Sequence, residues 1–248
     1  MSESGPPAVT AVNEGGASPY VLLCEHASNH IPAPYAGLGL EPDDLRRHIA
    51  WDIGAASLAR CLSNLLDAPL FLSGYSRLLI DCNRPLGAPT SIPTVSEATI
   101  IPGNQGLDAA ERARRAAAYH APFHRRVEQA LDGRAAGRPT IVIGVHSFTP
   151  VFLGERRPWH AGVLYGQATA FGQTLATRIG ADPTLCVGDN EPYRVTPNTD
   201  YTVPVHGDRR GITAALIEVR QDLIGDDAGV EAWAARLAPA LADVARVL

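Results

Sequence analysis

The chain has 248 residues, of which 46% are hydrophobic and 19% are charged, and its formal net charge is −5. This length is enough for a buried core, and the lack of a basic block disfavours nucleic acid or an anionic membrane as the main partner. The sequence has no apolar stretch of about 18 residues and no basic-then-apolar start, so we expect neither a membrane span nor a signal peptide.

The chain has four widely separated cysteines without C-x-x-C spacing: Cys24, Cys61, Cys82 and Cys186. This pattern argues against a zinc knuckle or a disulfide framework and favours a reducing compartment. We therefore expect a cytoplasmic protein whose partner is a small molecule, with no nucleic acid and no membrane as partner. Its oligomeric state is open.

The chain begins with a segment of low periodicity. Residues 1–18 contain Gly, Ser, Pro and Ala without a repeating apolar pattern, which predicts a disordered tail ahead of a single domain at residues 19–248. The apolar run that follows predicts a first strand over residues 20–24.

A helix is expected next. Apolar side chains recur at helical spacing between residues 41 and 65, and this spacing places His48 and Asp52 on one helix face. Two short strands are then expected over residues 69–72 and 77–80, and Pro85 ends the polar segment that follows the second.

The rest of the chain alternates between helices and strands. Three prolines between residues 86 and 106 predict a long loop that acts as a lid or a substrate wall. Residues 107–131 read as a helix that Pro122 kinks or splits, and the β-branched run 140–145 reads as a strand buried on both faces. The remaining elements expected are strands over residues 162–164, 185–187 and 213–220 and helices over residues 167–179 and 227–247. This alternation predicts one α/β domain with helices on both sides of a sheet.

Two histidines suggest a metal site. His26 and His146 each follow an apolar strand, and the carboxyl ends of strands are where α/β proteins place ligands. A catalytic zinc ion takes three protein ligands from His, Asp and Glu and keeps an open position. A structural role is the alternative for each histidine taken alone.

The third ligand has several candidates. Asp52, Glu25 and Asn29 are all close in sequence to His26 or to the following helix. Glu25 should point away from His26 because successive side chains of an extended strand alternate. His120 and His124 are also four residues apart, but the segment reads as an amphipathic helix broken at Pro122.

The last predicted strand carries a candidate base. Glu218 and Arg220 share one face of this strand by alternation. Glu218 could accept a proton from a catalytic water, or the two could form a structural ion pair.

Further polar residues suggest a carboxylate-binding site. Asn83 and Arg84 combine an amide with a guanidinium fork that suits a carboxylate, although a surface salt bridge of Arg84 is the plainer alternative. Arg77 could supply a second cation. A substrate with two carboxylates would need another contact, for which the candidates are Asn190, Arg194 and Arg220. Ser147, next to His146, is also assigned to substrate binding.

Seven segments in this order resemble the N-formylglutamate amidohydrolase family: CEHASNHIP, HIAWDIGA, SRLLIDCNRP, HSFTPVF, RPWHAGVLYG, GDNEPY and IEVRQDLI. The likeness runs from about residue 20 to residue 235. It implies a zinc-exopeptidase-like α/β/α sandwich with a mixed, mostly parallel sheet. It also implies hydrolysis of the acyl–amide bond of an N-acyl amino acid, N-formyl-L-glutamate being cleaved to formate and L-glutamate in amino-acid catabolism.

The order of the polar residues is also similar to that of zinc carboxypeptidases and related deacylases. There, histidines bind one zinc ion, an asparagine–arginine pair holds the substrate α-carboxylate, and a late glutamate activates water. The resemblance therefore implies zinc, or another divalent metal, at His26 and His146, with Glu218 as the catalytic base. The first histidine motif of those enzymes is H-x-x-E, whereas Asn29 stands three residues after His26, and we favour Asp52 as the third ligand.

Two other functions remain possible from the sequence. Cys24 or Cys82 could act as the nucleophile of a hydrolase with a strand-end histidine as base. The chain could also be a carboxylate-binding protein that keeps the fold without turnover.

Overall fold

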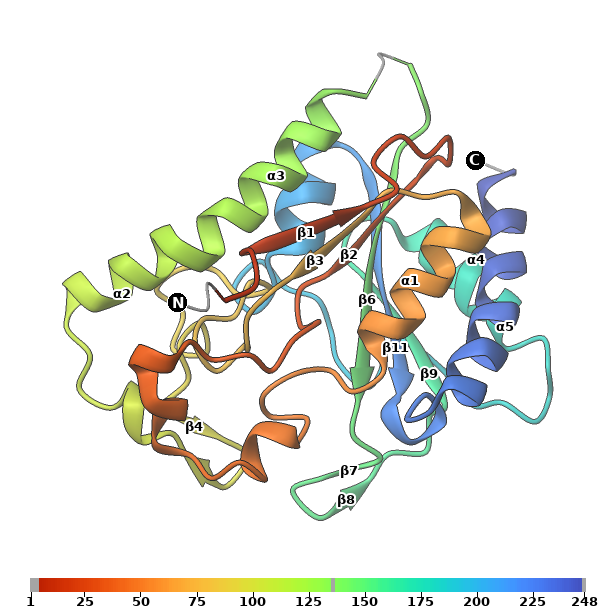
Figure 1. Ribbon diagram of the computed structural model, residues 1–248. Coiled ribbons are helices and arrows are strands. Elements are labelled where there is room, and N and C mark those ends of the chain that lie inside the picture. Colours follow the sequence, from red (N-terminus) through yellow and green to blue (C-terminus); the bar gives the residue numbers. More distant parts are fainter. Residues whose placement is uncertain (1–4, 135–136, 247–248) are drawn as a thin grey trace.

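The structure is a computed structural model, and it describes residues 5–134 and 137–246. Its central sheet has seven strands in the order β1-β3-β2-β6-β11-β9-β10 (Figure 1). These strands are β1 (Val9–Val12), β2 (Tyr20–Cys24), β3 (Leu70–Ser73), β6 (Ile141–Phe148), β9 (Ala161–Tyr165), β10 (Val187–Asp189) and β11 (Thr213–Arg220). Two small hairpins stand apart from the sheet, β4 (Val95–Ser96) with β5 (Thr99–Ile100) and β7 (Val151–Phe152) with β8 (Glu155–Arg156).

The sheet is mixed and mostly parallel. Strands β3, β2, β6 and β11 run parallel to one another, whereas β1 is antiparallel to β3 and β9 is antiparallel to β11. At the far edge β10 runs parallel to β9. This arrangement brings the carboxyl ends of β2, β6 and β11 to one edge of the sheet, where α/β proteins place their ligands.

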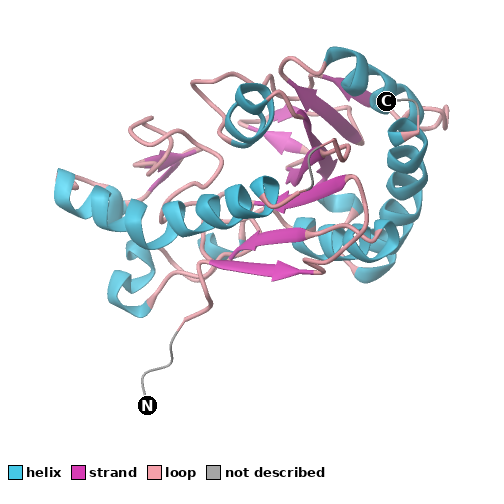
Figure 2. Ribbon diagram, turned by 90° about the horizontal axis from the view of Figure 1, so that it is seen from above, coloured by secondary structure: helices cyan, strands magenta, loops and turns pink. Residues whose placement is uncertain are grey.

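Helices cover both faces of the sheet (Figure 2). The α-helices are α1 (Ala55–Leu66), α2 (Ala109–Arg115), α3 (Ala121–Asp132), α4 (Thr169–Ile179) and α5 (Asp227–Ala245). Two π-helical turns, η4 (Ala116–His120) and η5 (Thr202–Gly207), accompany the 3-10 turns η1 (Ala33–Gly39), η2 (Asp44–Arg46), η3 (Pro102–Asn104), η6 (Asp208–Arg210) and η7 (Gln221–Leu223).

The side chains of β2 show how the two core layers form. Tyr20 and Leu22 belong to the core shared with α1, α4 and α5, while Val21 and Leu23 belong to the core shared with α3 and η5. The three-layer α/β/α architecture and the mixed sheet expected from the sequence are therefore confirmed.

The structure differs from the sequence prediction in the first third of the chain. Residues 9–12, assigned to a tail, form β1 and pair with β3 from Val9 to Val12; residues 1–4 of that tail lie outside the described part. The helix predicted over residues 41–65 begins only at Ala55. The reason is that Ile49 is buried in a separate apolar cluster with Leu78 and Leu79 instead of on the sheet.

The strand predicted over residues 77–80 is a turn. The Ser76 hydroxyl donates to the Ala50 carbonyl, and the Leu79 N–H donates to the Ser76 carbonyl. Leu78 and Leu79 are both buried because this turn packs beneath the loops, and a buried apolar run in a turn resembles a strand in sequence.

Most other predicted elements are confirmed. The last strand has the expected bounds, Thr213–Arg220. The helix predicted over residues 107–131 is continued through a π-helical turn at Ala116–His120, after which Pro122 occupies the first turn of α3, where its missing N–H costs least. No helix in residues 5–134 or 137–246 has the length and apolar character needed to cross a bilayer.

Candidate metal centre and active site

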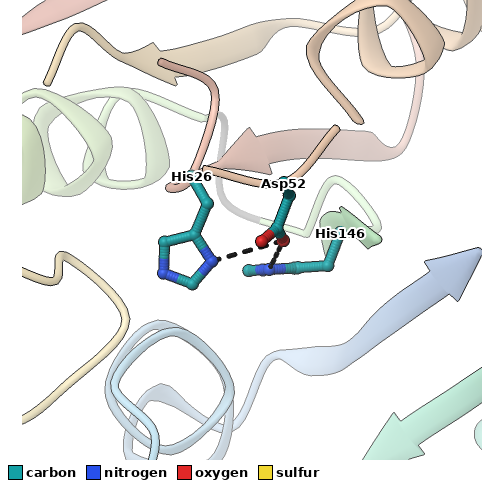
Figure 3. A group of neighbouring side chains, drawn as sticks. All are labelled: His26, Asp52 and His146. Atoms are coloured by element: carbon teal, nitrogen blue, oxygen red, sulfur yellow. Dashed lines mark hydrogen bonds and ion pairs between the residues drawn. The ribbon is translucent and has the colours of Figure 1, made fainter. Parts of the chain in front are cut away.

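Three predicted ligands converge at the carboxyl edge of the sheet. His26 follows β2, His146 lies in β6 beside it, and Asp52 lies in the turn before α1 (Figure 3). The Asp52 N–H donates to the His26 carbonyl over 3.0 Å, which holds this turn against the end of β2. One ligand atom from each of the three residues lies within 4.8 Å of the others, and all three side chains are buried.

Both imidazoles turn the same ring nitrogen toward the carboxylate. Asp52 Oδ2 lies 3.0 Å from His146 Nδ1 and 3.3 Å from His26 Nδ1. The opposite nitrogens contact two other carboxylates: His26 Nε2 lies 2.7 Å from Asp81 Oδ1, and His146 Nε2 lies 3.0 Å from Glu25 Oε2.

Arg77 links two of these carboxylates. Its guanidinium donates to Asp52 over 3.2 Å and to Asp81 over 3.1 Å. The Ser147 N–H also donates to Asp52 Oδ2 over 3.2 Å. Arg77 and Ser147, which lie outside the ligand trio, therefore hold the Asp52 carboxylate in place.

Charges at the centre favour a cation. Although burial opposes ionisation, the charge of His26 and hydrogen bonds from both histidines hold the pKa of Asp52 well below its usual range. Burial also opposes ionisation of Asp81 and Glu25. The charges of His26 and Arg77 nevertheless lower the pKa of Asp81. The charge of His146 lowers the pKa of Glu25. The nearby negative charges likewise outweigh burial and raise the pKa of His146.

This donor set fits a divalent metal ion. Two imidazole nitrogens and one carboxylate oxygen are typical ligands of zinc. Four carboxylates at the centre are buried, and Arg77 supplies one permanent positive charge to them, so a divalent cation would offset the remaining negative charge.

Glu218 stands beside the trio on the next strand. In the parallel pairing of β11 with β6 it is in register with His146, so the two side chains share one sheet face. Burial raises the pKa of Glu218 to about 7, with the His146 charge acting in the opposite direction. Its Oε2 atom is buried and has no hydrogen-bond partner among the described residues. A carboxylate with a pKa near neutrality suits a general base.

A cavity of about 480 Å³ opens onto these residues. The trio and Glu218 lie on its wall together with four predicted substrate residues, Arg77, Asn83, Arg84 and Ser147. The two small hairpins and the loop after β10 complete the wall through Val95, Glu97, Phe152, Tyr193 and Arg194. The long loop predicted to form a substrate wall therefore does line the cavity.

The predicted substrate residues play different parts in the structure. The Asn83 Oδ1 atom accepts hydrogen bonds from the N–H groups of Tyr201 and Thr202, so its amide holds the loop before η5. The Arg84 guanidinium donates to the Asn83 carbonyl and lies 3.7 Å from Asp200. Asn83 and Arg84 both line the cavity.

Two other predicted residues are engaged in local structure. The Ser147 hydroxyl donates to the Ile53 carbonyl. Asn190 has a positive φ of 55°, and its side chain accepts a hydrogen bond from the Tyr165 N–H. The structure does not bring Asn190 to the cavity wall.

Sequence reasoning did not assign Asp81 to the site. It stands two residues before Asn83, and its position after an apolar run was the available signal. Strand alternation predicts that Glu25 is a supporting or structural residue and not a ligand, and the structure places it beside His146 of the neighbouring strand β6.

His120 and His124 do not form a metal pair. His124 instead lies between the Cys82 carbonyl, 2.8 Å from Nε2, and His206 Nε2, 2.9 Å from Nδ1. His120 lies 3.3 Å from the Arg84 carbonyl. These histidines support the loop that presents Asn83 and Arg84.

Comparison with known proteins identifies the family to which the chain belongs. A family model described as N-formylglutamate amidohydrolase matches residues 18–225. No curated protein matches the chain. A solved gene product of Agrobacterium tumefaciens is 37% identical, with a TM-score of 0.93 over 98% of this chain and 96% of that one.

Two more distant structures share the fold. The N-formylglutamate amidohydrolase of Ralstonia eutropha is 20% identical, with a TM-score of 0.70 over 96% of this chain and 97% of that one. A bacteriophage poly-gamma-glutamate hydrolase is 11% identical, with a TM-score of 0.51 over 99% of this chain and 94% of that one. These similarities confirm the zinc-exopeptidase-like fold expected from the sequence.

Proposed function

Because the chain belongs to the N-formylglutamate amidohydrolase family of hydrolases, we propose that it is a metal-dependent enzyme that cleaves the acyl–amide bond of an N-acyl amino acid. The observation that carries this proposal is the convergence of His26, Asp52 and His146 beside the unpartnered carboxylate of Glu218 in one cavity. The substrate we propose is N-formyl-L-glutamate, with formate and L-glutamate as products.

Zinc is the metal proposed, with His26, Asp52 and His146 as its ligands. A bound zinc ion supplies Lewis-acid chemistry, which acidifies water and favours negative charge on a carbonyl oxygen. The chain's own residues supply the proton transfers. Glu218 accepts a proton from the attacking water and then donates it to the nitrogen of the departing amino acid.

Arginine side chains on the cavity wall support the choice of an acidic substrate. Arg84 is the proposed partner of the α-carboxylate, and Asn83 fixes the loop that carries it. Arg194 lies on the same wall and is the proposed partner of a second carboxylate. Arg77 is paired with Asp52 and Asp81, so its proposed role is to hold the site rather than to bind substrate.

Metal analysis combined with a substrate panel tests the proposal. We expect about one zinc ion per chain and hydrolysis of N-formyl-L-glutamate that a chelator abolishes and added zinc restores. The panel should vary the acyl group and the amino acid separately. A protein that contains zinc yet hydrolyses no member of the panel would be a binding protein of the same fold.

A cysteine nucleophile has little support in the structure. Burial raises the pKa of Cys24 and of Cys82, and neither thiol lies on the cavity wall. Activity that survives thiol alkylation but not chelation would exclude this mechanism. All four cysteines are free, which supports the cytoplasmic location that we propose.

A further inference from the structure

Glu25 occupies a buried position at the back of the candidate metal centre. Its side chain is 0% exposed, and its Oε2 lies 3.0 Å from His146 Nε2. This contact is an ion-pair distance without hydrogen-bond geometry, and neither of the two atoms has a hydrogen-bond partner in the described part of the chain. A carboxylate placed so deep in a core needs a reason, because burying an unpaired charge is costly.

The two nitrogens of the His146 ring face different groups. Nδ1 lies 3.0 Å from Asp52 Oδ2, whereas Nε2 faces Glu25. The two nitrogens of an imidazole point in nearly opposite directions, so Glu25 lies on the far side of the ring from the proposed ligand cluster. In a neutral imidazole one nitrogen carries the proton and the other offers a lone pair to a metal.

Thr202 fixes the carboxylate of Glu25. The Thr202 hydroxyl donates to Glu25 Oε1, which leaves Oε2 directed at His146. The Thr202 N–H donates to Asn83 Oδ1 over 3.0 Å, so the same residue joins the back of the metal centre to the loop of Asn83 and Arg84.

The space around His146 Nε2 is closely packed. A Cβ atom at Gly144 would lie 3.3 Å from this nitrogen and 2.4 Å from the Leu216 side chain. Position 144 therefore has no room for a side chain beside the His146 ring.

We propose that Glu25 is a positioning residue that keeps the proton of His146 on Nε2 and directs the Nδ1 lone pair to the metal. Thr202 acts through Glu25 by holding its carboxylate in this orientation. Carboxylates that orient a ligand histidine raise metal affinity by roughly 10–100-fold. This inference rests on the proposed metal site, and it adds two residues from outside the ligand trio.

Nitrogen-15 NMR of the unmodified protein tests the tautomer directly. In protein loaded with cadmium-113, we expect one-bond metal coupling at His146 Nδ1 and a protonated Nε2. Coupling at Nε2 would overturn the role of Glu25 while leaving the metal site in place. Failure of both zinc and cadmium to bind would instead overturn the metal site and, with it, this role.

Metal affinity in variants tests the contribution of the contact. Glu25→Met removes the acceptor at similar volume and should weaken zinc binding about 10–100-fold in competition with a chelator. Glu25→Gln keeps an acceptor oxygen, so its zinc affinity should be closer to that of the unmodified protein. Zinc affinity of Glu25→Met within about twofold of the unmodified protein, or equal losses in both variants, would contradict the proposal.

Thr202 offers a matched pair of variants. Thr202→Val removes the hydroxyl that holds Glu25, whereas Thr202→Ser keeps it. We expect weaker zinc binding in Thr202→Val and unchanged binding in Thr202→Ser. Equal affinities in the two variants would exclude the hydroxyl from this role.

Discussion

Burial favours the neutral form of two carboxylates that lie side by side in the candidate site, but it prevails at only one of them. It raises the pKa of Glu218 to about 7, whereas Asp52 is held ionised by His26 and His146 despite its burial. Neighbouring acids whose pKa values are pushed apart commonly divide the work, one holding charge and the other moving a proton. This contrast supports Asp52 as the proposed ligand and Glu218 as the proposed base.

Replacing Glu218 by Gln should separate chemistry from metal binding. The amide cannot accept the proton of water, so we expect kcat to fall about 10²–10⁴-fold while the zinc content is unchanged. Glu231→Gln, on the exposed side of α5, is the control and should leave both unchanged. Steady-state kinetics with metal analysis of each variant make the comparison, and full activity of Glu218→Gln would exclude it as the base.

Buried histidines behind the loop of Asn83 should make stability depend on pH. Burial lowers the pKa of His206 from 6.5 to about 4, and burial with the nearby His120 also lowers that of His124. Between pH 6.5 and about pH 4, His206 binds a proton in the unfolded chain but not in the folded chain. The free energy of unfolding should therefore fall as the pH falls below 6.5.

The size of this effect can be measured by denaturant unfolding of the metal-free protein. Between pH 6.5 and pH 5 the contribution of His206 should be about 1.5 kcal/mol. His206→Asn should lose this part of the pH dependence. Identical pH profiles for the two proteins would show that His206 is not held neutral.

At the scale of elements, the start of α1 determines where Asp52 lies. Gly54 precedes this helix with a φ of +79°, and a Cβ there would lie 2.1 Å from the Ile224 carbonyl oxygen. The turn that carries Asp52 therefore requires a residue without a side chain, because both its backbone conformation and its packing exclude one.

Gly54→Ala should harm both stability and metal binding. We expect a loss of about 2–4 kcal/mol in the free energy of unfolding from strain and crowding together, with zinc affinity at least about tenfold weaker. Gly211→Ala is the matched control, since Gly211 also has a positive φ of 63° but open space at its Cβ. It should cost about 1–2 kcal/mol and leave zinc affinity unchanged. Equal zinc affinities in the two variants would contradict the role of this turn.

Elements that carry strong apolar runs could be predicted from the sequence, and those fixed by distant contacts could not. Strand β11 has the predicted bounds because a buried central strand is apolar along its length. Strand β1 is short and half-buried, and its partner β3 lies about 60 residues later, so no local pattern marked it. The helical spacing around Ile49 reflected burial beneath loops and not a helix.

The same division holds for the candidate site. His26, His146 and Glu218 could be selected because each lies in or just after a strand whose apolar run is visible in the sequence. The contacts of Asp81 with His26 and of Glu25 with His146 depend on how three separate segments pack, which no spacing encodes. Asn190 shows that a polar residue after a strand end can also hold the local backbone.

For the whole molecule, metal should stabilise the folded state. Zinc that binds only the folded chain should raise the free energy of unfolding by about 2.7 kcal/mol at a free concentration 100 times its Kd. Thermal unfolding of chelator-treated protein, with zinc added back in steps, measures this as a rising Tm. Magnesium prefers oxygen ligands and should raise the Tm far less. A Tm that does not change when zinc is added would contradict a metal site at this position.

The position of β11 in the sheet has a consequence for how the chain is made. This strand leaves the ribosome after every other strand of the sheet, yet it lies between β6 and β9. While the chain is being synthesised, β1, β3, β2 and β6 can pair, and His26, Asp52 and His146 can come together early. Strands β9 and β10 have no place to dock until residues 213–220 have emerged. Glu218 therefore joins the site last, so a nascent chain could hold metal well before it could turn over substrate.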